Sequence, residues 1–230
     1  VFITHQLNVL SGKTSWLTTK LHLRYLLKFN SCWVPDVSGA ENLSGKLGHP
    51  EKIVEKINYI GPLSRIEKKT LPIKYDIMVL LSGPEPQRTL LEKKLIKELE
   101  NSSKEILFVK GIVESQQQIE KVNSITYYNF MNSEELSTAF NESEFVVCRS
   151  GYTTVMDLAK LEKKAFFIPT PGQYEQEYLA KKFKSEIVAP SCKQEKFKAS
   201  KLEKIHFYKG FKDFSVEPNW NELFSLFQGK

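Results

Sequence analysis

One stretch in the second half of the chain constrains the fold more than any other. Two apolar segments, at 145–147 and 165–168, enclose the run 148–158, and the second segment stops at a Pro/Gly loop, 169–172. This pattern predicts a strand, a turn at Ser150 and Gly151, a helix, and a second strand. A strand, a helix and another strand in this order are typical of a βαβ unit with parallel strands.

The same alternation continues along most of the chain. Charged or Gly-, Pro- and Asn-rich segments separate short apolar runs. We expect further strands at 1–4, 32–34, 57–60, 76–81, 106–109 and 125–128, and helices over 14–29, 89–99, 134–140 and 219–227. The sequence therefore predicts an α/β fold with Rossmann-like parallel sheets that helices cover on both faces.

The first predicted helix carries both apolar and basic side chains. Its expected apolar anchors are Trp16, Leu17, Leu21 and Leu27. Its basic residues recur every fourth position and form one stripe: Lys20, Arg24 and Lys28. The stripe is either a solvated helix face or a basic and apolar patch for a membrane surface.

The ends of the predicted strands indicate where a ligand would bind. Ligands of parallel α/β sheets bind beyond the carboxyl ends of the strands. Four pairs of residues follow such ends: Ser82 and Gly83, Phe130 and Met131, Ser150 and Gly151, Gly172 and Gln173. We expect them to line one crevice.

The turn before the helix at 152–158 suits an anionic ligand. Gly151 permits close approach of a ligand to the backbone. The first N–H groups of the helix and the hydroxyls of Thr153 and Thr154 can hold phosphate oxygens, where the helix dipole favours negative charge. Asp157 lies one turn further and can accept hydrogen bonds from sugar hydroxyls. The alternative is an ordinary strand-to-helix turn with a carboxylate favoured by the dipole.

Composition narrows the remaining classes of protein. The net charge of +6 is mildly basic and the lysines are spread along the chain, which argues against nucleic-acid binding. Three widely spaced cysteines, Cys32, Cys148 and Cys192, favour a reducing, cytoplasmic setting. No apolar run approaches the roughly 18 residues of a membrane span, and no signal peptide is visible. Neither an Asp-x-Asp pair nor a histidine spacing indicates a metal site.

Three motifs in one region carry a resemblance to a known family. They are Arg149-Ser150-Gly151-Tyr152-Thr153-Thr154 with Asp157, the loop Pro169-Thr170-Pro171-Gly172, and Glu175-Gln176-Glu177-Tyr178-Leu179-Ala180. In this order they resemble the C-terminal domain of family 28 glycosyltransferases, which include the N-acetylglucosaminyltransferase of the peptidoglycan lipid intermediate. The segment 4–12 is also similar to a loop near the end of that family's N-terminal domain.

The resemblance implies a GT-B architecture, in which the C-terminal domain binds a nucleotide-sugar donor and the N-terminal domain binds the acceptor. It implies no cofactor and no metal. The donor contacts that it carries over are Ser150, Gly151, Thr153 and Thr154 on the diphosphate, Asp157 (in place of the family's glutamate) on the ribose, Glu175 and Gln176 on the sugar, and Phe130 and Met131 at the position whose backbone pairs with uracil. Arg149 could pair with phosphate or with a local carboxylate such as Glu144.

Two departures from the family pattern affect the expected chemistry. The family's Gly-Gly-Ser loop is replaced here by residues 82–87, whose two prolines remove N–H donors from a phosphate site at Ser82 and Gly83. Arg88 could supply charge instead. The chain starts at Val1 inside a predicted strand, so we expect a truncated N-terminal domain, a catalytic base upstream, and a fragment that is inactive alone. Within the fragment, His5 is the candidate for a catalytic residue of the cleft, and the alternative is a hydrogen-bonded loop histidine.

These inferences combine into a domain plan and a function. Residues 1–60 would be the rest of the acceptor-side domain, 61–192 the nucleotide-sugar-binding domain, and 193–230 a basic tail with a C-terminal helix that packs back on the domains. The predicted function is metal-independent transfer of a sugar from a nucleotide-diphospho-sugar, expected to be a UDP-sugar, to a glycan or lipid-linked acceptor. The expected location is cytoplasmic, with peripheral membrane contact. The alternatives are a nucleotide-sugar hydrolase or epimerase, and a non-catalytic nucleotide-sugar-binding module.

Overall fold

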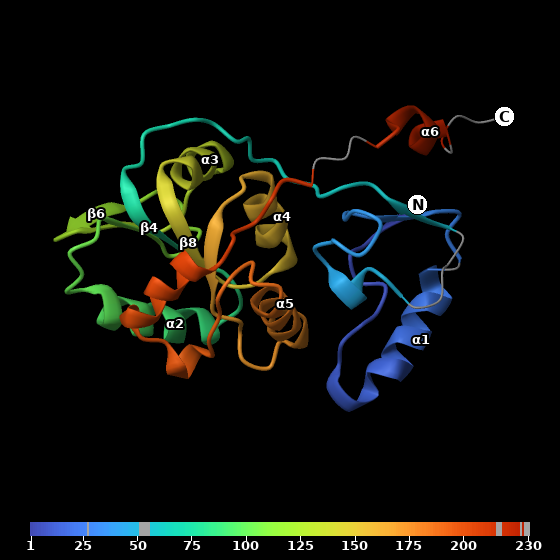
Figure 1. Ribbon diagram of the computed structural model, residues 1–230, viewed down its shortest axis with the longest axis horizontal. Helices are drawn as coiled ribbons and strands as arrows, with labels where there is room; N and C mark the ends of the chain where they lie inside the picture. The colour runs from blue at the N-terminus through green and yellow to red at the C-terminus, as the bar shows by residue number, and fades with distance from the viewer. Residues whose placement is uncertain (27, 51–55, 215–217, 226, 228–230) are drawn as a thin grey trace. The chain divides into compact units, whose positions relative to one another are not determined.

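The chain forms two compact units, which we call the smaller and the larger unit (Figure 1). The computed structural model describes residues 1–26, 28–50, 56–214, 218–225 and 227. Residues 1–63 and 214–230 make the smaller unit, and residues 64–213 make the larger one. Both contain parallel strands and helices, so the predicted α/β class is confirmed.

The smaller unit is built on a short parallel sheet in the order β1-β2-β3. Its elements are β1 (Phe2–Ile3), η1 (Gly12–Thr14), α1 (Ser15–Leu26), β2 (Cys32–Val34), η2 (Gly45–Leu47), β3 (Ile57–Tyr59) and α6 (Trp220–Ser225), where η marks a 3-10 helix. The buried cluster of this unit consists of Leu7, Leu26, Cys32 and Val34. The cluster joins α1 to the sheet through the end of the helix.

The apolar residues expected to anchor α1 do not face the core. Three of them are exposed to 70%, 45% and 51%, in this order: Trp16, Leu17 and Leu21. The helix instead packs through Leu26 and the partly buried Leu23. Leu27, the fourth expected anchor, lies outside the described residues. The prediction was wrong because α1 carries apolar residues on more than one side, so periodicity could not select the buried side.

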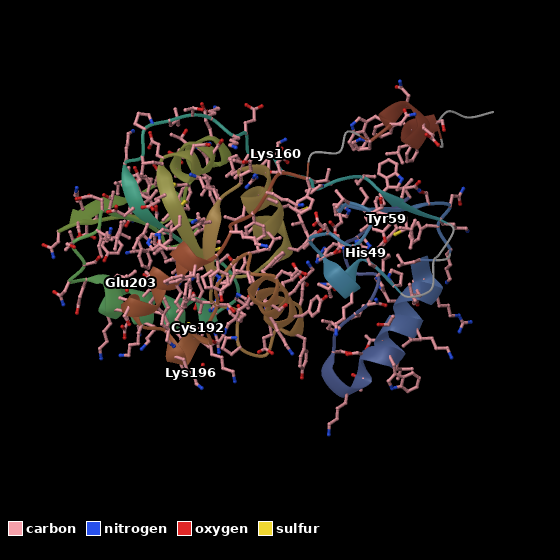
Figure 2. The ribbon with its side chains drawn as sticks, viewed as in Figure 1. His49, Tyr59, Lys160, Cys192, Lys196 and Glu203 are labelled. Carbon is pink, nitrogen blue, oxygen red and sulfur yellow. The ribbon has the colours of Figure 1, made fainter. Side chains whose placement is uncertain are left out.

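A buried carboxylate organises the loop that follows β2. Asp36 accepts hydrogen bonds from the backbone N–H groups of Leu43 and Ser44 at 2.9 and 2.7 Å, and from the Ser44 hydroxyl. It also accepts one from His49 Nε2 at 3.4 Å. The His49 ring stacks on Tyr59 of β3, with the ring centroids 4.6 Å apart (Figure 2). This loop was predicted only as irregular, and Asp36 was not singled out.

Aromatic side chains of α6 and of Phe227 pack on Trp33 of β2. Trp33 is only 5% exposed. Its ring lies edge-on to those of Trp220, Phe224 and Phe227, with centroids 6.4, 5.6 and 6.3 Å away. The aromatic residues of the helix predicted over 219–227 therefore cover Trp33 within the smaller unit.

The larger unit contains a six-stranded sheet in the order β6-β7-β5-β4-β8-β9. Its elements are β4 (Tyr75–Leu80), α2 (Gln87–Leu99), β5 (Ile106–Val109), β6 (Ile119–Val122), β7 (Ile125–Tyr128), α3 (Ser133–Asn141), β8 (Ser143–Cys148), α4 (Tyr152–Lys160), β9 (Lys164–Phe167), α5 (Tyr174–Ser185), η3 (Gln194–Lys196) and η4 (Ala199–Phe207). All neighbouring strands are parallel except β6, which pairs antiparallel with β7.

The sheet of the larger unit is covered on both faces. α2 and α5 lie on one face, and α3 and α4 lie on the other (Figure 1). On the α2 face, Leu91 and Leu95 pack with Val79, Phe108 and Val147 in one buried cluster. Strands buried on both faces read as continuous apolar runs, which is why the sequence located them well.

Strand β6 is the one element of this sheet that we did not predict. All four of its residues are exposed, and Glu120 and Lys121 occupy its centre. An edge strand protected by charged side chains lacks the apolar signal used for the other strands.

Residues 193–213 complete the larger unit. Phe197, Leu202 and Ile205 are 0%, 7% and 2% exposed. They belong to the buried cluster that contains Leu91 and Leu95 of α2. The lysine-rich segment grouped above with the C-terminal helix thus contributes core residues here, whereas residues 214–230 belong to the smaller unit.

Candidate functional site

The segments expected to form a crevice follow strands that run in the same direction. β4, β7, β8 and β9 are parallel, so the chain leaves all four at the same edge of the sheet. From β4 the chain continues towards β5, whereas from β8 it continues towards β9 on the other side. The sheet therefore has a topological switch point between β4 and β8, the usual position of a ligand crevice in such folds. Ser82, Gly83, Ser150 and Gly151 follow these two strands.

The N-terminus of α4 lies at this switch point. Gly151 is its N-cap with φ −73° and ψ 142°, and no side chain among the described residues caps it. A Cβ placed on Gly151 would meet no described atom within 4 Å. Thr153 is exposed and Thr154 is half-buried. Among the described residues, the helix thus begins without a side-chain cap and beside open space at Gly151, an arrangement that suits an anion.

Ser150 and Arg149 are structural within this turn. Ser150 is completely buried and its hydroxyl donates to the Gln176 carbonyl at 2.7 Å. Arg149 is 1% exposed. The sequence leaves a phosphate or Glu144 as the partner of Arg149, but its guanidinium donates to backbone carbonyls and an amide oxygen instead. Neither side chain reaches the open space in front of Gly151.

Asp157 faces the segment that begins the larger unit. Its Oδ1 accepts a hydrogen bond from Ser64 Oγ at 2.7 Å. Burial raises the pKa of Asp157 above its ordinary value, although the Ser64 hydrogen bond and the charge of Arg65 oppose the shift. The side chain is half-buried. Ser64 was not identified from the sequence, because no local motif pairs residues so distant in the chain.

The amide of Gln176 shapes the Pro/Gly loop. Its Oε1 accepts from the Thr170 N–H at 2.9 Å, and its Nε2 donates to Gln173 Oε1 at 2.5 Å. Gly172 donates its N–H to Glu177 at 3.0 Å. Glu175 is half-buried in the first turn of α5. Of the two residues expected to meet the sugar, Gln176 is therefore engaged within the loop.

The loop after β4 approaches the loop after β9. Ser82 and Gly83 are exposed, and a Cβ on Gly83 would lie 3.8 Å from Thr170 Oγ1. Gly83 has φ +104°, which only glycine adopts readily. Thr170 Oγ1 is buried without a hydrogen-bond partner among the described residues. The sequence signal for Thr170 was its place between two prolines.

Arg88 does not extend into the crevice. Its guanidinium pairs with Glu85 at 2.5 Å and with Glu92 at 2.7 Å, and it donates to the Lys110 carbonyl at 3.1 Å. Only 10% of its side chain is exposed. Two carboxylates already neutralise this cation, so it is poorly placed to supply charge to a phosphate.

Phe130 and Met131 follow β7, further along the edge. The Phe130 N–H donates to Asn129 Oδ1 and its carbonyl accepts from Gln117 Nε2, both at 3.0 Å. The Phe130 backbone is therefore used within the protein. Met131 lines a hollow of about 350 Å³ beside α3, together with Tyr128. His5 belongs to the smaller unit, where it is half-buried.

The α/β fold of this chain is shared with solved structures of glycosyltransferases. Three solved structures are similar to this chain at low sequence identity. They are a glycosyltransferase of kitacinnamycin (13% identity, TM-score 0.52, 76% of this chain and 45% of that one), CalG4, the calicheamicin glycosyltransferase (7%, 0.54, 85% and 50%), and MurG of Acinetobacter baumannii (16%, 0.51, 99% and 58%). The chain spans about half the length of these proteins.

A sequence profile gives the family itself. The profile described as the glycosyltransferase family 28 C-terminal domain matches residues 87–206, which is 120 of 230 residues. The chain belongs to glycosyltransferase family 28, as its motifs indicated. No curated protein sequence matches it. Among the described helices, none is both long and apolar enough to cross a bilayer.

Proposed function

We propose that the larger unit binds a nucleotide-diphospho-sugar, with uridine as the base, at the N-terminus of α4. The observation that carries this proposal is the uncapped helix start at the switch point, with open space in front of Gly151. The Thr153 and Thr154 hydroxyls would assist the helix N–H groups on the diphosphate. Asp157 would contact the ribose after exchanging its bond to Ser64, and Glu175 would contact the sugar.

In the complete enzyme this site would serve metal-independent transfer of the sugar to an acceptor hydroxyl. As the bond from the sugar to the diphosphate breaks, negative charge grows on the leaving phosphate oxygens. The first N–H groups of α4 and its dipole would stabilise that charge without reorganising. A base outside this unit would take the proton of the acceptor hydroxyl while the acceptor oxygen bonds to the anomeric carbon of the sugar, and the nucleoside diphosphate leaves.

Substitution of Gly151 by alanine tests the site directly. Because Gly151 has an ordinary φ and an added methyl group meets no described atom, Gly151→Ala should fold, with a cost of about 1 kcal/mol or less at the N-cap. The methyl group would occupy the anion position. We expect UDP to raise the melting temperature of the wild type, and Gly151→Ala to lose most of that rise.

Gly210→Ala is the matched control. Gly210 has φ +84°, and a Cβ there would lie 3.0 Å from Lys164 Cγ, so alanine should destabilise the unit. Its response to UDP should nevertheless remain. If no uridine, guanosine, cytidine or thymidine diphosphate stabilises the wild type, the donor proposal is wrong. Binding of UDP without sugar transfer by the complete protein would favour the non-catalytic module, and release of UDP without acceptor would favour the hydrolase.

We also propose that the protein acts in the cytoplasm and touches an anionic membrane through α1. Its three cysteines are free, in keeping with a reducing compartment. α1 exposes Trp16, Leu21 and Tyr25 (64%) beside Lys20 and Arg24, and such mixed surfaces bind anionic lipid. The first 35 residues contain no Asp or Glu.

Vesicle sedimentation tests this contact. The protein should sediment with phosphatidylglycerol vesicles at low salt and remain in solution with phosphatidylcholine vesicles. Replacing Lys20 and Arg24 together by glutamate should abolish sedimentation. Equal binding to both kinds of vesicle would contradict the proposal.

A further inference from the structure

Arg149 joins three segments at the candidate site. Its NH1 donates to the carbonyls of Ile168 and Pro169 at 2.9 and 3.1 Å. Its NH2 donates to the Gln87 carbonyl at 2.9 Å and to Gln194 Oε1 at 2.7 Å. Gln87 starts α2, Ile168 and Pro169 follow β9, and Gln194 starts η3. One side chain thus fixes the loops on both sides of the turn at Gly151.

Arg149 is also a buried cation that pairs with no carboxylate among the described residues. It is 1% exposed, and none of the ion pairs found among the described residues includes it. Its Nε has no hydrogen-bond partner in the described part of the chain. Burial lowers the pKa of Arg149 to about 10, so the group is still charged at pH 7. A buried charge of this kind is costly unless another charge balances it.

The geometry contrasts with that of Arg88, the other buried arginine of this edge. Arg88 is neutralised by Glu85 and Glu92. Arg149 instead stands two residues before the uncapped start of α4 and is held only by neutral oxygens. The positive charge of Arg149 is therefore buried next to the turn where the anion is expected. Burial weakens the screening of this charge by salt.

We propose that Arg149 is a positioning residue of the nucleotide site, which ties its loops together and holds a buried positive charge whose counter-ion is the diphosphate of the bound nucleotide. The inference rests on the proposed function, since it needs an anion at Gly151. It adds that nucleotide affinity depends on a residue that the ligand does not touch. The dependence should grow with the charge of the ligand.

Gln194→Glu provides a nearly isosteric test. It keeps an oxygen acceptor 2.7 Å from Arg149 but gives the guanidinium a carboxylate partner. The melting temperature should stay the same or rise. The Kd for UDP, measured by calorimetry at low salt, should rise about tenfold, that for UMP less, and that for uridine by no more than about twofold. If Arg149 serves only the stability of the fold, Gln194→Glu should change the melting temperature in the same way but leave the Kd for UDP unchanged.

Two further variants separate charge from tethering. Arg149→Gln should lower stability and should weaken the binding of UDP most, that of UMP less and that of uridine least. Arg149→Lys keeps the positive charge, so it should recover UDP binding without recovering stability. Lys97→Gln, at an exposed position near the other end of α2, changes net charge equally and should leave UDP binding unchanged.

The outcomes also separate this inference from the proposal on which it rests. If the wild type binds none of the three probes, both are overturned. If the wild type binds UDP and Gln194→Glu binds it equally well, the donor site stands and the role of Arg149 is rejected. Equal losses for UDP, UMP and uridine would likewise reject it, because they would indicate a distorted site.

Discussion

Asp36 and Arg149 are both buried charges that hydrogen bonds hold in place, but their neighbours differ. Burial alone would raise the pKa of Asp36, yet the hydrogen bonds from His49, Ser44 and Leu43 outweigh it, and the pKa falls below its ordinary value. The carboxylate is therefore stabilised in its charged form by the loop that it organises. Arg149 receives no such net compensation, since burial lowers its pKa.

Asp36→Asn should destabilise the smaller unit. The amide offers one oxygen and places an NH₂ group among donors, so we expect a loss of about 2 kcal/mol in the free energy of unfolding at pH 7. Because the folded pKa of Asp36 is depressed, its contribution is present above about pH 4 and is lost as the pH falls through the folded pKa. Urea titrations at several pH values should show the difference from wild type shrinking only in that acidic range. Asp213→Asn, which removes a partly exposed pair with Lys160, should change the stability by less than about 1 kcal/mol.

Arg88→Gln should separate stability from ligand binding. The substitution leaves Glu92, whose side chain is 15% exposed, without its partner and should cost about 1–3 kcal/mol in the larger unit. Because Arg88 is already neutralised, the Kd for UDP should change by no more than about twofold. Denaturation followed by circular dichroism and a calorimetric titration would measure the two effects. A tenfold loss of UDP affinity would show that Arg88 serves the phosphate after all.

At the scale of single elements, helix ends carry much of the local information. Asn132 caps α3 by accepting from the N–H groups of Glu134 and Glu135, and the Glu135 carboxylate accepts from the Asn132 N–H. This capping box fixes the start of α3 at Ser133, directly after the N-cap Asn132. At α4 the corresponding position is occupied by Gly151, which leaves the helix start open.

Asn132→Ala should therefore destabilise the larger unit by about 1 kcal/mol. Asn132→Ser, which keeps a capping oxygen, should recover most of the loss. Thermal unfolding followed at 222 nm would measure both variants. Equal melting temperatures for alanine and serine would show that the cap contributes nothing to stability.

At the scale of the whole molecule, each unit has its own buried cluster. The three tryptophans, Trp16, Trp33 and Trp220, all belong to the smaller unit, whereas the proposed nucleotide site belongs to the larger one. Tryptophan fluorescence thus reports one unit, while far-ultraviolet circular dichroism is dominated by the other. The two signals can be used to follow the units separately.

We expect UDP to raise the unfolding midpoint seen by circular dichroism without moving the midpoint seen by tryptophan fluorescence excited at 295 nm. Asp36→Asn should do the reverse. The physical reason is that a ligand stabilises only the cooperative unit that binds it. Coincident midpoints that shift together with UDP would show that the two units unfold as one.

The sequence by itself determined the elements whose signal is local. Continuous apolar runs located the strands that are buried on both faces, such as residues 106–109 and 145–147, and the turn at Ser150 and Gly151 located the start of α4. The family motifs also lie in this region. β6 was missed because its exposed residues carry no apolar period.

Only the tertiary structure decided how side chains distant in sequence are used. Arg149 contacts Gln87 and Gln194, and Ser64 contacts Asp157, across separations that no local pattern encodes. The same holds for α1, whose buried side depends on the sheet that it covers. The sequence determined where an anion-binding turn stands, because turn chemistry is local. The fold decided that Ser150, Gln176 and Arg149 support the turn through buried hydrogen bonds, because packing sets which polar groups remain open to a ligand.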